Sequence, residues 1–320
     1  DLVRSRGLGD VYKRQGLTVR YGRVPERPVT LQGRREDWLD ADYAYRVPLI
    51  LKDVGVDRTG LTVPVSVRLD FTRLLKALGR QAAIDPASVR MVGLNRPGST
   101  VVKNVPPAWQ FDVAPDYDPL ANARGTLTYL YGGPVGVGRA WFVYFGVRGI
   151  PRQSPMFEPQ VTVRDAVPFQ GQDSYQISTG AATYYYHKEG GGFASLQDPD
   201  GREWIGYKPG GRGEGEFRGI PNLGEVGHPG YTGERGVKSR LLNVGPIKAA
   251  IASESADGRW HWMWEIFPAC ARLSMLKAGS PYWFLYEGTP GGRLEPEKDF
   301  VVLSNGVRLP ASERWSHDIP

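Results

Sequence analysis

Short runs of alternating apolar and polar residues, separated by glycine and proline, recur along most of this chain. In residues 45–51, YRVPLIL, every second residue from Tyr45 onwards is apolar. A period of two is that of a β-strand with one buried face. By the same pattern, we predict further strands in the first half at 61–69, 88–94, 109–112, 125–131 and 139–147.

The strictest alternation lies in residues 259–267, RWHWMWEIF. A strand here places two sets of side chains on opposite faces. One face carries Trp260, Trp262, Trp264 and Ile266, and the other carries His261, Met263, Glu265 and Phe267. The rest of the second half is also predicted to be β, with strands at 183–188, 193–196, 203–207 and 272–277, a strand pair within 241–253, a strand at 282–287 and a hairpin turn at Asn305-Gly306.

One helix is predicted, over residues 71–78. Its apolar residues recur at positions i, i+3, i+4 and i+7 from Phe71, which is the spacing of one helix face. Asp70 precedes it as an N-cap, and Gly79 follows it as a stop.

These elements predict an all-β chain of two domains. Short strands between Gly/Pro turns indicate a β-sandwich at 41–150, and residues 151–170, rich in proline and polar residues, indicate a linker. A second all-β domain is predicted at 171–320, and a linker at 16–40.

We exclude residues 1–15 from the fold. Residues 10–15, DVYKRQ, are the translation of GAT GTG TAT AAG AGA CAG, which resembles the transposon end used in preparing sequencing libraries. We therefore expect these residues to be a translated adapter artefact, and we expect the chain after them to lack its natural N-terminus. A signal peptide would not be observable in such a chain. We predict a secreted or periplasmic protein.

Composition narrows the function classes. Hydrophobic residues make up 41% of the chain and charged residues 23%, as in globular proteins. No stretch has the roughly 18 apolar residues of a membrane-spanning helix. The basic residues are dispersed, which argues against nucleic acid as a partner. The single cysteine, Cys270, excludes an intramolecular disulfide.

Residues 183–207, TYYYHKEGGGFASLQDPDGREWIGY, carry the most informative pattern. The order is a glycine run, a small apolar strand, an Asp-x-x-Gly turn and a returning strand. This order resembles the opening of galactose-mutarotase-like β-supersandwich proteins. The resemblance implies carbohydrate chemistry, because that fold serves aldose epimerases and the sugar-binding domains of several polysaccharide lyases and glycoside hydrolases. Related proteins continue with further strands, so we expect the supersandwich to be truncated.

The favoured hypothesis is β-eliminative cleavage of a uronate-containing polysaccharide or oligosaccharide. A cation neutralises the uronate carboxylate, and a base then removes the acidified α-proton. Arg218 or Lys188 would supply the cation, and His187 or Tyr186 the base. Arg218 is a candidate because apolar residues flank it within a long glycine-rich loop, and its guanidinium can bind a carboxylate at two points.

Three alternatives remain open. A glycoside hydrolase would use two carboxylates from Glu189, Glu265 and Glu287. An epimerase would pair His228 with Glu265 or Glu287. A glycan-binding module would have no catalytic residues. We predict no cofactor and keep a divalent metal as an open alternative. A metal site is conceivable from His187, His228 and Glu265, although they lack the usual ligand spacing, and the glycine-rich segments lack the context of a nucleotide loop.

Aromatic residues are the commonest candidates for substrate binding, because sugar rings stack their apolar C–H faces on them. Packing in the core is the competing explanation for most of these residues. The predicted substrate-binding set combines aromatic and hydrogen-bonding side chains: Tyr184, Trp204, Asn222, Tyr282 and Glu287.

Overall fold

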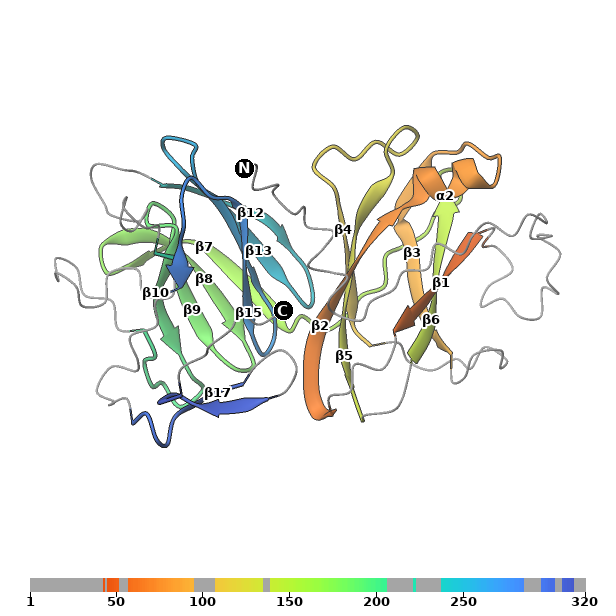
Figure 1. Cartoon of the computed structure of the whole chain (residues 1–320). Coiled ribbons are helices and arrows are strands. Elements are labelled where there is room, and N and C mark those ends of the chain that lie inside the picture. The colour runs from red at the N-terminus through yellow and green to blue at the C-terminus, as the bar shows by residue number, and fades with distance from the viewer. Residues whose placement is uncertain are drawn as a thin grey trace, which may run out of the picture. The chain divides into compact units, whose positions relative to one another are not determined.

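The computed structural model describes residues 43, 45–51, 57–94, 107–134, 139–205, 221–222, 237–284, 295–302 and 307–313. Almost all of the regular structure in these residues is β-strand, so the predicted all-β class is confirmed. The chain divides into two compact units, with the boundary between Phe157 and Glu158 (Figure 1). No helix in the described part is long and apolar enough to cross a membrane.

The first unit is a sandwich of two antiparallel sheets, each with three strands in the orders β1-β6-β3 and β2-β5-β4. Both sheets contribute buried side chains to one core, in which Phe71 packs on Phe145 and Tyr129 on Trp141. The strands are β1 (Tyr45–Leu51), β2 (Arg58–Asp70), β3 (Ile84–Leu94), β4 (Trp109–Val113), β5 (Arg124–Gly133) and β6 (Arg139–Val147).

The one described helix, α2 (Phe71–Ala77), follows β2 directly. The Asp70 side chain accepts a hydrogen bond of 2.8 Å from the Arg73 backbone N–H, as expected of an N-cap. Phe71 and Leu75 are buried on the core side. Gly79, at φ 66°, ends the helix in the left-handed region that suits glycine. The predicted helix, its cap and its stop are confirmed.

The second unit is built on two four-stranded antiparallel sheets, in the orders β10-β9-β8-β7 and β12-β13-β14-β15. The strands are β7 (Val161–Phe169), β8 (Gln172–Thr179), β9 (Thr183–His187), β10 (Gly192–Gln197), β12 (Val237–Val244), β13 (Ala249–Ser255), β14 (His261–Ile266) and β15 (Ala271–Lys277). Two short pairs accompany them, β11 (Pro221–Asn222) with β16 (Trp283–Phe284) and β17 (Phe300–Val302) with β18 (Arg308–Pro310).

The tryptophan face of β14 forms the centre of the second core. Trp262 is fully buried and Trp264 nearly so, and Phe193 of β10 lies 4.7 Å from Trp264 between ring centroids. Tyr184 and Tyr186 of β9 belong to the same cluster. The predicted alternation is confirmed, although Glu265 and Phe267 on the opposite face are buried as well.

Strand β7 corrects the predicted linker, because Val161–Phe169 belong to the sheet. Its proline and charged residues resemble a linker, but β7 is an edge strand, where Pro168 needs no partner for a missing N–H. A register shift between Arg164 and Val167 interrupts the strand. Gln170 and Gly171, both at positive φ, then form the two-residue turn to β8.

Two other strand predictions are only partly met. The returning strand at 203–207 reduces to an isolated bridge between Glu203 and Gln197. The predicted strand at 282–287 is β16 at Trp283–Phe284, and its remainder lies outside the described residues. The Asn305-Gly306 turn also lies outside them, between the paired strands β17 and β18.

Gly191, in the glycine run between β9 and β10, is required by both its conformation and its surroundings. Its φ is 67°, and an added Cβ would lie 2.6 Å from Trp262 Cζ2 and 2.7 Å from Val237 Cγ1. The sequence suggested a tight turn or a close approach to a ligand. The structure shows the turn, and the close approach is made to the Trp262 indole.

We predict that Gly191→Ala lowers the free energy of unfolding by about 3 kcal/mol, since backbone strain and overpacking each cost roughly 1–3 kcal/mol. Gly201→Ala is the matched control, because Gly201 has φ 80° but open space around its Cα. It should cost only the strain, about 1 kcal/mol. Equal losses in urea denaturation would contradict the packing role of Gly191.

Candidate functional site

Tyr186 is a core residue. Its side chain is fully buried, and its hydroxyl donates to the Gly191 carbonyl at 2.7 Å and lies 2.7 Å from Ser253 Oγ. Since the single phenolic proton goes to the carbonyl, Ser253 donates to Tyr186. Burial raises the pKa of Tyr186 above its ordinary value. This environment argues against the predicted role of Tyr186 as a base, because the hydroxyl is both enclosed and engaged.

His187 is also enclosed. It has no exposed surface, and its Nε2 lies 3.1 Å from the Phe169 carbonyl. Because a carbonyl only accepts, the ring carries its proton on Nε2. Burial lowers the pKa of His187 to about 4, so the ring is neutral at pH 7. This burial argues against the predicted catalytic role of His187, since no part of the ring is exposed.

Lys188 is engaged by two carboxylates. Its Nζ lies 2.5 Å from Asp165 Oδ1 and 2.7 Å from Asp173 Oδ2, and it stands over the Tyr175 ring. Burial alone would lower the pKa of Lys188, but these two acids outweigh it and raise the pKa above its ordinary value. Lys188 therefore ties β9 to the β7–β8 hairpin, and its charge is already neutralised. The prediction that it neutralises a uronate is not supported.

Glu265 lies in a buried ion cluster. Its Oε1 is 3.2 Å from Lys248 Nζ, and its Oε2 accepts from Arg272 Nε at 2.8 Å and Nη2 at 2.6 Å. Both oxygens are therefore occupied by cations within the protein. This pairing argues against the predicted role of Glu265 as a catalytic carboxylate.

Most of the other predicted catalytic and substrate-binding residues fall partly outside the described ranges and partly in strands. Arg218, His228 and Glu287 lie outside the described residues, and so does the predicted meeting of Arg218 with His187. Asn222 belongs to β11, opposite Trp283. Tyr184 packs against Phe193 in the core, and burial raises its pKa. The burial of Tyr184 argues against its predicted contact with substrate.

Trp204 differs from these residues because its side chain is 39% exposed and still held in place. Its indole Nε1 donates to Asp198 Oδ2 at 3.1 Å, and its backbone N–H donates to Leu196 at 2.8 Å. The ring is thus presented to solvent in a set orientation at the edge of β10. An exposed aromatic ring held in this way suits stacking on a sugar.

The turn before Trp204 is rigid and polar. Asp198 Oδ1 accepts from the backbone N–H groups of Asp200 and Arg202, at 3.0 and 2.9 Å. These bonds, first that from Arg202, lower the pKa of Asp198. Arg202 Nη1 lies 2.5 Å from Asp200 Oδ2. We call residues 198–204 the Trp204 loop; the sequence indicated its Asp-x-x-Gly turn but not that Asp198 orients the indole.

Tyr282, the second exposed aromatic of the predicted set, is 44% exposed. Its ring meets Trp260 edge-on, with 6.5 Å between centroids. No hydrogen bond to another described residue orients its hydroxyl. Tyr282 therefore remains a predicted substrate contact, with less fixed geometry than Trp204.

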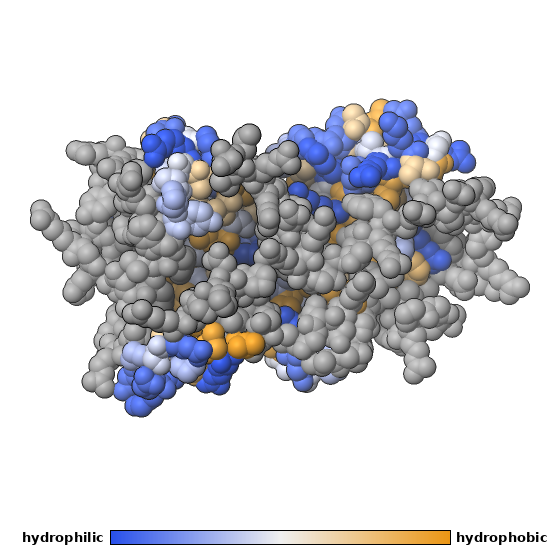
Figure 2. Space-filling model, viewed as in Figure 1, coloured by the Kyte–Doolittle hydropathy of each residue, from blue (hydrophilic) through white to orange (hydrophobic). Residues whose placement is uncertain are grey.

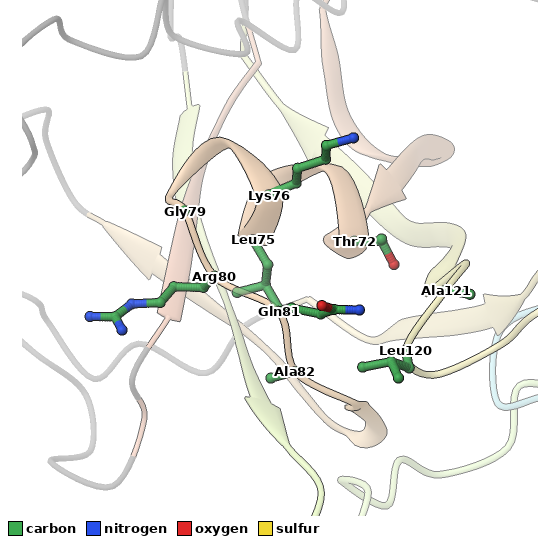
Figure 3. A pocket seen from close by; sticks show the side chains of 9 residues that line it. All are labelled: Thr72, Leu75, Lys76, Gly79, Arg80, Gln81, Ala82, Leu120 and Ala121. Atoms are coloured by element: carbon green, nitrogen blue, oxygen red, sulfur yellow. The ribbon is translucent and has the colours of Figure 1, made fainter.

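The first unit contains a cavity that the sequence did not indicate. It has a volume of about 440 Å³ and lies between α2, the segment that follows it, and the loop at 118–122 (Figure 3). The sequence showed this helix only as a structural element. Its lining comprises Thr72, Leu75, Lys76, Gly79, Arg80, Gln81, Ala82, Leu120 and Ala121.

Within the described ranges, no three His, Cys, Asp or Glu side chains gather as metal ligands. A scan of the sequence against protein-family models finds no match, and a search of the curated proteins finds none either. The likeness to mutarotase-like proteins therefore remains a prediction from the sequence pattern.

We predict that the His187 ring titrates with a midpoint near pH 4 in the folded protein, well below its ordinary value of 6.5. Because the unfolded chain takes up this proton more readily, the folded state loses stability as pH falls from about 6.5 to about 4. NMR titration of the ring tests the midpoint. A midpoint near 6.5 would contradict its burial.

Proposed function

We propose that this protein binds a polysaccharide or oligosaccharide through the Trp204 loop and that the second unit acts as a glycan-binding module. The observation that carries the proposal is the exposed Trp204 indole, which Asp198 holds in one orientation. A ring ordered before binding loses little conformational entropy when a sugar stacks on it. The side chains of Asp200 and Arg202, both exposed, are available to hydrogen-bond sugar hydroxyls.

We favour a binding role over the lyase hypothesis because the described catalytic candidates of the lyase are buried or paired. Tyr186 and His187 have no exposed surface, and Lys188 is paired with two acids. The hydrolase hypothesis is less favoured because Lys248 and Arg272 occupy both carboxylate oxygens of Glu265. The proposal keeps the predicted glycan partner and the predicted secreted or periplasmic location, and it assigns no chemistry to the described residues.

Substituting Trp204 by alanine should weaken glycan binding about tenfold, because a stacked ring contributes on the order of 1 kcal/mol or more beyond its buried area. Affinity gel electrophoresis against polygalacturonate, alginate, xylan and a β-glucan measures the change for whichever polymer the wild type retards. Leu242→Ala is the matched control, since Leu242 is a similarly exposed apolar residue of the same unit. Equal retardation of all three proteins would overturn the proposal.

Asp198→Ala should weaken binding several-fold although the Trp204 side chain is still present, because the indole loses the acceptor that orients it. The loss should be smaller than that in Trp204→Ala. A thermal melt checks that the turn itself has not unfolded. Unchanged affinity in a folded Asp198→Ala protein would show that orientation of the ring is irrelevant.

The same polymers distinguish binding from cleavage. Under the proposal, incubation with the uronate polymers yields no ultraviolet absorbance from unsaturated products. Unsaturated products from wild type, undiminished in Tyr186→Phe and Trp204→Ala, would contradict the binding-only role and place a lyase centre elsewhere in the chain.

A further inference from the structure

We infer that the cavity beside α2 in the first unit is a second binding site, for a small carboxylate-bearing sugar such as a free hexuronate. The cavity is independent of the Trp204 loop, which belongs to the other unit. Its volume of about 440 Å³ lies within the range of roughly 300–1,000 Å³ of small-molecule sites.

Apolar side chains line one part of the cavity. Leu75 is 1% exposed, whereas Leu120 on the opposite wall is 44% exposed. In Figure 3, Leu120 and the Gln81 side chain reach toward the same space from the two walls. An exposed leucine facing a buried one offers a surface for the C–H face of a sugar ring.

The polar side chains of the lining are donors. Lys76 and Arg80 are its only charged residues, and neither forms an ion pair with another described residue. Gln81 is exposed and makes no hydrogen bond to the described part of the protein. Thr72 Oγ1 accepts from the Ala123 backbone N–H at 2.8 Å, which leaves its own proton to donate.

These donors favour an anion. Figure 3 shows the Lys76 and Arg80 side chains extending outward from the rim in different directions, so each must rotate about its side-chain bonds to contact a ligand held between the walls. Arginine binds a carboxylate with two parallel hydrogen bonds. Hydrophilic residues, with a few hydrophobic ones among them, also predominate over this part of the surface (Figure 2).

The two walls are held in place without a ligand. Asp118 Oδ1 accepts from the N–H groups of Leu120 and Ala121, at 2.9 and 2.6 Å, and these bonds lower the pKa of Asp118. Ile84 N–H donates to the Pro119 carbonyl at 2.8 Å. On the helix side, the Arg80 N–H donates to the Leu75 carbonyl at 2.9 Å. The Asp118 carboxylate is thus committed to the loop backbone, and the walls are ordered before binding.

The test is a titration of the whole chain with sodium glucuronate. Binding is measured by isothermal titration calorimetry and by the change in NMR chemical shift of the Gln81 side-chain amide. We expect saturable binding, with glucose and inorganic sulfate each at least tenfold weaker. Equal binding of sulfate would indicate an adventitious ion only, and equal binding of glucose would remove the role of the cations. Either result overturns the inference.

Variants locate the site. The double substitution Lys76→Gln with Arg80→Gln should weaken glucuronate binding at least tenfold, whereas Lys238→Gln with Arg240→Gln, which removes the same charge from the second unit, should change it less than twofold. Leu120→Ala, which keeps every charge, should also weaken binding. Trp204→Ala should leave glucuronate binding unchanged. A failure of the cavity site can therefore be distinguished from a failure of the proposed glycan binding at the Trp204 loop. Equal losses in both double variants would overturn the inference.

Discussion

The contact between Trp262 and Gly191 is the constraint on which the second unit depends. The indole Nε1 donates to the Gly191 carbonyl at 3.0 Å, and the same carbonyl accepts the Tyr186 hydroxyl. Ser253 and Ser239, 2.8 Å apart, continue this buried network into the other sheet. Each hydrogen bond adds about 1 kcal/mol, but leaving one of these buried groups unpaired costs about 1–3 kcal/mol, so the network selects a single packing of the two sheets.

That packing explains why the C-terminal end of β9, with Tyr186 and His187, is buried. Tyr186 extends into the network, and His187 on the opposite side of β9 is covered near Phe169. The aromatic abundance of the second unit is therefore mainly core. The aromatic residues that the core does not use remain the candidates for ligand contact, and Trp204 has the most firmly oriented side chain among those described.

Both proposed sites are formed by turns attached to rigid elements. In the Trp204 loop one aspartate arranges the backbone and orients the ring. Beside α2, Asp118 arranges the loop that faces the helix. In each case the aspartate carboxylate accepts hydrogen bonds from backbone N–H groups and does not itself contact the ligand. It keeps the neighbouring side chains in place, and this order lowers the conformational entropy lost on binding.

The sequence by itself determined the all-β class, most strands, the capped helix and the two-sided pattern of β14, because these depend on neighbours within a few residues. Trp204 and Tyr282, which the sequence predicted as substrate contacts, are both exposed, and that role stays a prediction. Tertiary structure decided which strand faces are covered, that 161–169 form an edge strand, and that Lys188 and Glu265 meet ionic partners from other strands. A period of two shows which residues share a face of a sheet, but only the packing of distant segments shows whether that face meets water, a ligand or the core.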